Sequence, residues 1–266
     1  MTKRKPLSSS GIFYDSSNLT DFKKWFNSGI LGGATTNPLI LQKDGVLDLP
    51  GHIIKMIKIA GPGFPISIEV PDSEMSSGDM VALAVKYHQK FPKNAIIKIP
   101  MDPRNPQKAF NVAYELGQKG VRVNATLGLS TGQLIGAAEA LRHSKAAGDN
   151  YISLFWARRD EAKDQIVKDI VKDGMKKPEA LERVPDAAET LKIVLKYLES
   201  HDLPLRVIVG SIRRVDQIDK AFSLGADIVT ITPPLIQQWI HTQRGVETAG
   251  EFNQAYRSIK NKFRII

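Results

Sequence analysis

Eight short apolar runs, recurring at fairly regular intervals, constrain the fold of this chain more than any other feature. Each run is rich in Ile, Val, Phe or Thr, and most are bounded by Gly, Pro, Asp or Asn, which is typical of short buried β-strands. The runs cover residues 11–16, 33–38, 65–70, 95–100, 121–127, 151–156, 205–211 and 226–232. We therefore predict a strand at each of them.

Stretches with helical periodicity lie between these runs. Examples are residues 19–28, 76–91, 106–118, 131–144, 186–198 and 215–224. The last of them ends before Gly225, a residue type that is favoured just past the end of a helix. Strands and helices that alternate eight times predict an α/β fold, a closed (β/α)8 barrel of the TIM type.

An open, doubly wound sheet is the competing architecture. It would usually contain fewer strands, and its nucleotide-binding form carries a Gly-rich turn after the first strand. Here the Gly-rich segment 29–33 precedes a strand. No linker divides the chain, so we expect a flexible tail over residues 1–10 and one barrel domain over 11–266. The sequence pattern of residues 249–263 predicts an extra amphipathic C-terminal helix, which could pack on this barrel or on a neighbouring molecule.

Composition excludes several kinds of chemistry. The chain of 266 residues is 42% hydrophobic, enough for one large core, and it contains no cysteine. Disulfides, thiolate catalysis and Cys-based zinc sites are therefore excluded. The five histidines lack the spacing of metal ligands, so no metal site is expected. No apolar stretch has the length of a membrane span, and the first ten residues lack the apolar core of a secretory signal. We expect a cytoplasmic protein.

The formal net charge of +9 is compatible with nucleic acid, an acidic membrane surface or an anionic small substrate as the partner. Lys and Arg residues are mixed with acidic residues, as in the stretch 158–182, and no arginine-rich block is interleaved with aromatics. Nucleic-acid binding is therefore not expected. Much of the excess charge is solvated surface.

Lys98 lies within the otherwise apolar run 95–100. An ammonium group inside a buried strand is costly to desolvate, so it needs a partner, a route to water or a chemical role. One interpretation is that Lys98 leans out at the strand end and pairs with a carboxylate. The other is that burial favours a neutral amine, which attacks a carbonyl and forms a Schiff base.

Polar residues stand near the carboxyl ends of the other predicted strands, where barrel enzymes carry their active sites. They are Asp15 and Asn18, Thr35 to Asn37, Glu69, Asn124 and Thr126, Ser153 and Arg158, Ser211 and Arg213, and Thr230 and Thr232. Singly, each has a structural explanation: Asp15 and Asn18 as turn or cap residues, Asn37 as a turn former before Pro38, and Glu69 as the salt-bridge partner of Lys98. Together they predict one catalytic mouth.

The sequence motifs at these positions resemble those of the transaldolase family, class I Schiff-base enzymes that move a dihydroxyacetone unit between sugar phosphates. The resemblance runs in order from about residue 11 to 235. The motifs are Phe13-Tyr14-Asp15-Ser16-Ser17-Asn18-Leu19, Ala34-Thr35-Thr36-Asn37-Pro38, Ile97-Lys98-Ile99-Pro100, Val123-Asn124-Ala125-Thr126-Leu127, Ser153-Leu154-Phe155 with Arg158, Gly210-Ser211-Ile212-Arg213, and Gly225-Ala226-Asp227-Ile228-Val229-Thr230.

The resemblance implies a role for each of these residues. Lys98 forms the Schiff base, Asp15 exchanges a proton with the C4 hydroxyl, and Glu69 acts through a water held by Thr126. The implied substrate-binding residues are Thr36, Asn37, Asn124, Ser153 and Phe155, with Arg158, Ser211 and Arg213 as the phosphate site. Such enzymes need no metal or organic cofactor. Small members form homo-oligomers, often rings of five or ten subunits through the C-terminal helix, and act in the pentose phosphate pathway.

Two choices remain open within this resemblance. Fructose-6-phosphate aldolases of the same family release free dihydroxyacetone, and they carry Gln and Tyr where this chain has Glu69 and Phe155, which favours transfer. The usual Ser-Pro-Phe-Val-Gly-Arg segment reads Ser153-Leu154-Phe155-Trp156-Ala157-Arg158 here, which puts the position of Arg158 in doubt and suggests an atypical sugar. Two further functions compete with these: a non-catalytic sugar-phosphate-binding barrel, and a metal-dependent aldolase, which the histidine and cysteine content disfavours.

Overall fold

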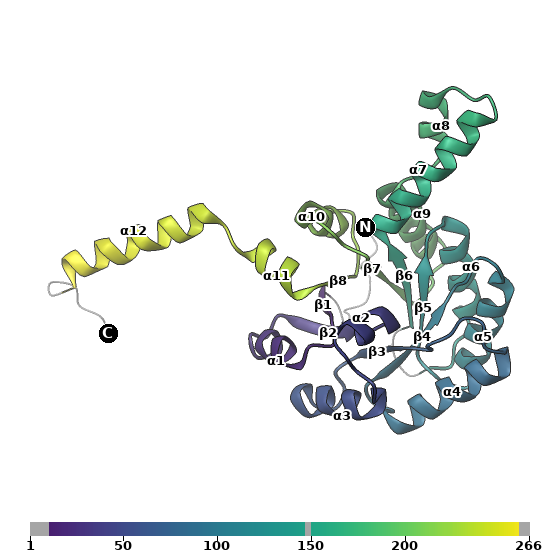
Figure 1. Cartoon of the computed structure of the whole chain (residues 1–266), viewed down its shortest axis with the longest axis horizontal. Helices are drawn as coiled ribbons and strands as arrows, with labels where there is room; N and C mark the ends of the chain where they lie inside the picture. Colours follow the sequence, from purple (N-terminus) through teal and green to yellow (C-terminus); the bar gives the residue numbers. More distant parts are fainter. Residues whose placement is uncertain (1–10, 147–149, 261–266) are drawn as a thin grey trace.

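Eight parallel strands close into a barrel surrounded by helices (Figure 1), as the alternating sequence pattern predicts. The computed structural model describes residues 11–146 and 150–260. The strands are β1 (Gly11–Asp15), β2 (Leu31–Thr35), β3 (Ile66–Glu69), β4 (Ala95–Pro100), β5 (Val123–Gly128), β6 (Asn150–Phe155), β7 (Leu205–Gly210) and β8 (Ile228–Ile231). Each strand pairs with its sequence neighbours, and β8 pairs with β1, which closes the barrel.

Helices follow every strand, and most of them cover the outside of the barrel. They are α1 (Leu19–Asn27), α2 (Pro38–Lys43), α3 (Leu49–Ala60), α4 (Ser77–Lys90), α5 (Pro106–Gln118), α6 (Thr131–Leu141), α7 (Trp156–Lys172), α8 (Lys177–Arg183), α9 (Ala187–Ser200), α10 (Val215–Ser223), α11 (Pro233–Ile240) and α12 (Gln243–Ile259). Within the described residues, no helix is both long and apolar enough to cross a bilayer.

The predicted runs differ from the strands mainly where a helix starts early. The run 33–38 extends past the end of β2 because Asn37 caps α2, its side chain accepting a hydrogen bond from the Ile40 amide, and Pro38 opens the helix. The run 151–156 likewise overshoots, because Trp156 is already the first residue of α7. Apolar composition marks these residues as buried, but it does not separate a strand end from a helix start.

A small cluster of buried side chains fills the inside of the barrel: Phe13, Ile96, Tyr151, Ile208 and Ile228. Phe13 and Tyr151 meet edge to face, with ring centroids 6.0 Å apart. Gly33 is required beside them, since a Cβ there would lie 2.4 Å from the Phe13 ring. We call this cluster the floor of the barrel, and we call the polar residues at the carboxyl ends of the strands its mouth.

Strand alternation places the polar residues directly above that floor. Side chains two positions apart face the same side of a strand, so inward-facing residues form successive layers. Asp15, Lys98, Ser153 and Thr230 each follow a floor residue by two positions, namely Phe13, Ile96, Tyr151 and Ile228. The two-residue period that turns the floor residues inward therefore also brings the polar side chains together at the carboxyl ends of the strands.

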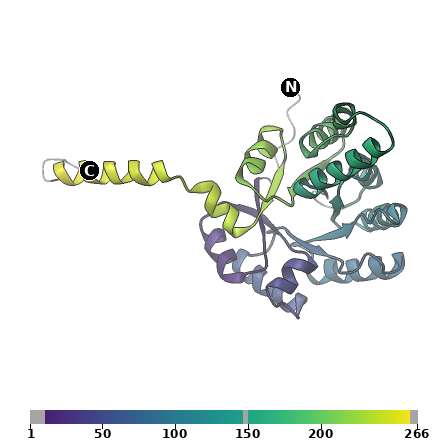
Figure 2. The same ribbon diagram turned by 45° about the horizontal axis from the view of Figure 1, so that its top comes forward.

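Helix α12 extends away from the barrel in both ribbon views (Figures 1 and 2), and none of its residues is buried. It includes most of the predicted helix 249–263 but begins earlier, and positions 261–263 of that prediction lie outside the described residues. Val246, Phe252, Tyr256 and Ile259 are exposed on it. The predicted flexible tail, residues 1–10, also lies outside the described residues.

Candidate active site

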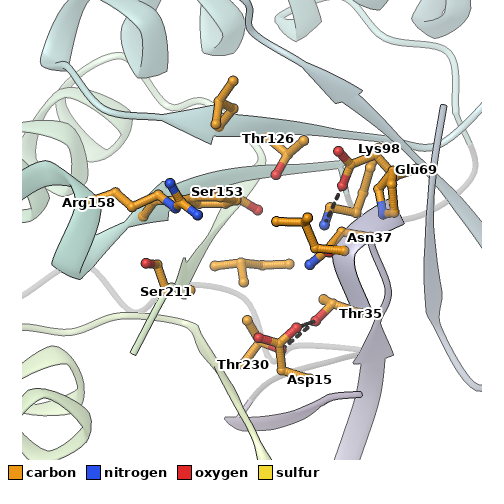
Figure 3. Close-up of a pocket in the computed structure, with 16 residues that line it drawn as sticks. Asp15, Thr35, Asn37, Glu69, Lys98, Thr126, Ser153, Arg158, Ser211 and Thr230 are labelled. Carbon is orange, nitrogen blue, oxygen red and sulfur yellow. Dashed lines mark hydrogen bonds and ion pairs between the residues drawn. The ribbon is translucent and has the colours of Figure 1, made fainter. Parts of the chain in front are cut away.

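A cavity of about 450 Å³ opens at the carboxyl ends of the strands (Figure 3). The structure brings nine of the predicted site residues to its walls: Asp15, Asn37, Glu69, Lys98, Thr126, Ser153, Phe155, Arg158 and Ser211. These side chains come from β1, β3, β4, β5 and β6 and from the segments that follow β2, β6 and β7. Residues distant in sequence thus converge where a barrel carries its chemistry.

Lys98 is buried, with 4% of its surface exposed, and it is held from two sides. Its Nζ lies 2.9 Å from Glu69 Oε2 and donates a hydrogen bond of 2.9 Å to the carbonyl oxygen of Thr36. Glu69 is directly opposite Lys98 in the β3–β4 register, which explains why the two side chains meet. Lys98 therefore does pair with a carboxylate, but it does so inside the cavity and not by leaning out.

Asp15 lies across the mouth from Lys98 and accepts a hydrogen bond from Thr35, which in turn contacts Thr230. Thr35 Oγ1 donates to Asp15 Oδ1 at 2.7 Å, and Thr35 Oγ1 is also 2.5 Å from Thr230 Oγ1. Burial raises the pKa of the Asp15 carboxyl, the Thr35 hydrogen bond and the Lys98 charge lower it, and the Glu69 charge raises it, with a net increase. A carboxylate in this setting is a stronger proton acceptor than an exposed one.

Thr126 carries a buried hydroxyl that has no hydrogen-bond partner among the described residues. It lies on the cavity wall together with Lys98 and Glu69. A buried polar atom without a partner is rare in folded proteins and points to a water or ligand atom that completes it. The hydroxyl is thus suited to holding a small molecule beside the lysine.

Asn124 is connected to the cavity wall by a hydrogen bond and does not line the cavity itself. It is fully buried, it accepts a hydrogen bond of 2.6 Å from Ser153 Oγ, and its Nδ2 donates to Ser67 Oγ at 3.2 Å. Of these three residues, only Ser153 lines the cavity. Asn124 therefore reaches the cavity wall through its hydrogen bond with Ser153, and its direct contact with a substrate stays a prediction.

Asn37 and Thr36 follow β2 and differ in what they offer. Asn37 lines the cavity while its side-chain oxygen caps α2, which leaves its amide nitrogen free of partners within the described chain. Thr36 is buried, and its hydroxyl donates to the Ser67 carbonyl at 3.1 Å. Thr36 reaches the site through its backbone carbonyl, which holds Lys98, and its side chain does not line the cavity.

The opposite end of the cavity is open and cationic. Arg158 lies in the first turn of α7, is exposed, and forms no ion pair with any described residue. The α7 amino terminus has no side-chain cap, and its partial positive charge adds to that of Arg158. The doubt raised by Leu154, Trp156 and Ala157 does not remove Arg158 from the cavity: Trp156 and Ala157 are buried behind it.

Arg213 is the third predicted site residue, after Asn124 and Thr36, that does not line the cavity. It is exposed, and its guanidinium pairs with Glu161 on α7. Its neighbour Ser211 does line the cavity, and the Ser211 carbonyl accepts a hydrogen bond from the Ala157 amide at 3.2 Å. Arg158 is therefore the cation that lines the open end of the cavity, whereas Arg213 does not line it and is paired with Glu161.

Two residues of the cavity wall have a left-handed backbone conformation. Leu127 has φ of 67° and Ser211 has φ of 56°. Leu127 falls where the pairing of β5 with β6 is interrupted between Ala125 and Gly128. Non-glycine residues rarely adopt this conformation, and they concentrate at functional sites.

Sequence reasoning locates Thr35 and Thr230 at strand ends but assigns them no role, and it does not single out Ser67 or Leu127. Threonine is common in strands, so identity alone gives no signal for the first pair. Their position two residues past inward-facing Gly33 and Ile228 is the signal that was available. Within residues 11–146 and 150–260, no group of three His, Cys, Asp or Glu side chains is arranged to hold a metal ion.

Comparison with known proteins gives a consistent family. The family model described as Transaldolase/Fructose-6-phosphate aldolase matches residues 12–265. A probable transaldolase of Symbiobacterium thermophilum is 30% identical over 239 residues, which cover 89% of this chain and 93% of that protein. A probable transaldolase of Brachyspira hyodysenteriae is 29% identical over 254 residues, covering 94% of this chain and 99% of that protein.

Proposed function

Because this chain belongs to the Transaldolase/Fructose-6-phosphate aldolase family, we propose that it transfers a dihydroxyacetone unit between sugar phosphates through a Schiff base on Lys98. The observation that carries the proposal is the buried Lys98 amine, 2.9 Å from the Glu69 carboxylate and facing a cavity of about 450 Å³. A cavity of this size is within the range of small-molecule sites. The paired carboxylate supplies what the amine needs to become a nucleophile.

Schiff-base formation starts with proton transfer from the Lys98 ammonium to Glu69. The neutral Nζ then adds to the C2 carbonyl of the ketose phosphate, and the carbinolamine loses its C2 hydroxyl as water to give a protonated imine. Glu69 returns the proton to the departing hydroxyl. The unpartnered Thr126 hydroxyl supports this step, because it can hold the water through which Glu69 acts.

Carbon–carbon cleavage assigns a second proton transfer to Asp15. Asp15 takes the proton from the C4 hydroxyl, the C3–C4 bond breaks, and its electron pair passes into the iminium to give an enamine and an aldehyde. Addition to an acceptor aldehyde reverses these steps, with Asp15 returning the proton. A positioned general base contributes about 10²–10⁴-fold in rate, and its raised pKa suits the task.

Binding groups fall at the two ends of the sugar. Ser153, the Asn37 amide and Phe155 lie near the dihydroxyacetone end, with Asn124 behind Ser153. Arg158, Ser211 and the α7 amino terminus bind the phosphate, because a guanidinium matches phosphate oxygens bidentately. Arg213 also binds the phosphate once its ion pair with Glu161 is broken.

Transfer and free cleavage are separated by an acceptor test. Fructose 6-phosphate is incubated with and without erythrose 4-phosphate, and the products are identified by mass spectrometry. Transfer predicts a seven-carbon ketose phosphate and a three-carbon aldose phosphate only when the acceptor is present. Free dihydroxyacetone without an acceptor would indicate the fructose-6-phosphate aldolase reaction. Neither product from folded protein would contradict both reactions with this donor, and a sugar-phosphate-binding barrel would follow if no other donor is converted either.

An atypical sugar phosphate is the second substrate candidate. The observation that favours it is the altered segment around Arg158, where Trp156 and Ala157 pack in the protein interior behind the phosphate end. A panel of ketose phosphate donors and aldehyde acceptors tests it. Clear preference for fructose 6-phosphate with erythrose 4-phosphate would count against it.

Helix α12 supports a homo-oligomer. Within the described chain none of its residues is buried, Phe252 is 70% exposed and Val246 54%, and a second copy of this chain is the partner that we propose for this apolar surface. We propose a ring of five or ten subunits in the cytoplasm. Light scattering of the full chain and of Phe252→Glu tests this: the substitution should lower the mass, and a monomeric full chain would contradict the proposal.

A further inference from the structure

Three side chains on adjacent strands form a short hydrogen-bonded chain at the mouth of the barrel (Figure 3). Asp15 ends β1, Thr35 ends β2 opposite it in register, and Thr230 lies on β8, the other neighbour of β1. The two threonines are nearly inaccessible, with 2% and 6% of their surfaces exposed. Asp15 Oδ2 makes no hydrogen bond within the described residues, so one carboxylate oxygen is fixed by Thr35 and the other is available to a substrate.

Counting the hydrogens fixes the direction of this chain. A hydroxyl has one hydrogen to donate, and an ionised carboxylate only accepts. When Asp15 is ionised, Thr35 spends its hydrogen on Asp15 Oδ1, so Thr230 must donate to Thr35. When Asp15 is protonated on Oδ1, it donates to Thr35, and the Thr35 hydrogen is then free to turn to Thr230. Both arrangements satisfy the same two short contacts, and they differ only in the direction of donation.

We propose that Thr230 is a positioning residue that acts through Thr35 on Asp15, setting the direction of the hydrogen bonds at that carboxylate and so its readiness to take and return a proton. The proposal rests on the proposed function, in which Asp15 exchanges a proton with the C4 hydroxyl. Donation from Thr230 polarises the Thr35 hydroxyl and strengthens its bond to the ionised carboxylate, an effect that is larger in a buried setting than in water.

The charged groups around Asp15 show why this matters. Lys98 on β4 favours the ionised carboxylate and Glu69 on β3 opposes it, while burial opposes it most strongly. The Thr35 hydrogen bond is the largest influence that favours ionisation, ahead of Lys98. Thr230 reinforces that bond without touching the substrate-facing oxygen, so it adjusts the base and leaves the reacting geometry alone.

The test compares Thr230→Ser with Thr230→Ala, a pair that differs only in the hydroxyl. The carboxyl resonances of ¹³C-aspartate-labelled protein are titrated, and the Asp15 resonance is assigned by its absence from Asp15→Asn. Thr230→Ser should keep the wild-type Asp15 pKa. Thr230→Ala should make Asp15 a two- to tenfold weaker acid, raising its pKa by about 0.3 to 1 pH unit, because a neutral hydrogen bond is lost.

Thr230→Val is the second variant, because it fills the space that water would occupy in Thr230→Ala. Thr190→Val removes the hydroxyl of a buried threonine on α9, which accepts a hydrogen bond from Arg159, and it controls for general loosening of the core. An unchanged Asp15 pKa in both the Ala and the Val variants would overturn the proposal. So would an equal shift in Thr230→Ser or in Thr190→Val.

The acid limb of the pH profile of kcat gives a second readout, since it should move upward with the Asp15 pKa in Thr230→Ala and stay in place in Thr230→Ser. A lower kcat with an unmoved limb would mean a merely structural role and would also overturn the proposal. The titration needs no turnover. If no sugar phosphate is converted by the wild type, the proposed function fails while the Thr230 effect on Asp15 is still decided.

Discussion

The two ends of the cavity are built differently. At the lysine end the polar groups are buried or half-buried and are paired: Lys98 with Glu69 and the Thr36 carbonyl, and Asp15 with Thr35. At the phosphate end Arg158 is exposed and unpaired among the described residues, and Arg213 is engaged by Glu161 on the surface. Bond making and breaking need groups that are fixed in advance in a low-dielectric setting, whereas a phosphate is held well enough by mobile cations.

This difference predicts a hierarchy of mutational effects. Changes at the buried, paired end should act on kcat and be large. Changes at the open end should act on KM for phosphorylated substrates and be smaller, because binding that is equal in ground and transition states affects KM alone.

Lys98→Met should have the largest effect, with turnover reduced to background, because no other lysine among the described residues lines the cavity to form the Schiff base. The measurement is the initial rate of transfer, with thermal unfolding to show that the variant folds. Lys58→Met, on the exposed face of α3, is the matched control and should keep wild-type rates. Appreciable turnover by Lys98→Met would contradict the assignment of bond making and breaking to the lysine end of the cavity.

Asp15→Asn should reduce kcat by about 10²–10⁴-fold, because the base is lost while the hydrogen bond from Thr35 is retained. KM should change little. A larger change in KM than in kcat would indicate that Asp15 acts in substrate binding and not in the chemical step.

The same variant should be more stable than the wild type at neutral pH. The pKa of Asp15 is raised on folding, mainly by burial, so its contribution to the free energy of unfolding is present at low pH and is lost as pH rises through the folded-state pKa. Asparagine does not ionise and escapes that loss. Denaturant unfolding across the pH range should show the advantage of Asp15→Asn shrinking as the solution becomes acidic. An advantage that grows toward acidic pH would contradict the burial argument.

Arg158→Ala should raise KM for fructose 6-phosphate by about 10- to 100-fold with a small change in kcat, as expected for the loss of charge-assisted hydrogen bonds to a phosphate. Steady-state kinetics with dihydroxyacetone as donor and glyceraldehyde as acceptor, neither of which carries a phosphate, provide the control, since that reaction should be unaffected. Equal losses with both donors would show that Arg158 does not act through the phosphate.

Arg213→Ala and Glu161→Gln should have the smallest effects, and with opposite signs. Exposed ion pairs are typically worth about 0.2–1 kcal/mol, so a change of up to about fivefold in KM is expected from each. Removing Arg213 should raise KM for the phosphorylated donor, and freeing it from Glu161 should lower it. Asp164→Asn, one turn further along α7, matches the charge change of Glu161→Gln and should be silent. A rise in KM for Glu161→Gln would show that Glu161 helps Arg213 to bind.

The sequence predicts the buried end better than the open end, and the reason is physical. Strand periodicity determines which way Asp15, Glu69, Lys98 and Thr126 point, so knowing the strands is enough to bring them together. The barrel and the convergence of these residues were therefore predictable. Arg213 follows a strand end, where no periodicity applies, and its long side chain finds Glu161, which sequence spacing does not reveal.

The second layer behind the site also escaped sequence reasoning. Asn124 accepts a hydrogen bond from Ser153 and is not among the residues that line the cavity, while Thr35 binds Asp15 and Thr230 contacts Thr35, none of which a distinctive motif reveals. Which of two inward-facing residues lines the cavity depends on depth along the barrel axis. That depth follows from strand stagger, a property of the closed sheet.

Borohydride trapping tests the central claim most directly. The protein is incubated with fructose 6-phosphate, reduced with sodium borohydride, digested and mapped by mass spectrometry, and the incubation is repeated with dihydroxyacetone. The account predicts a sugar-derived adduct on Lys98 and none on that peptide in Lys98→Met. Folded wild-type protein that gives no adduct on Lys98 with either sugar would contradict it.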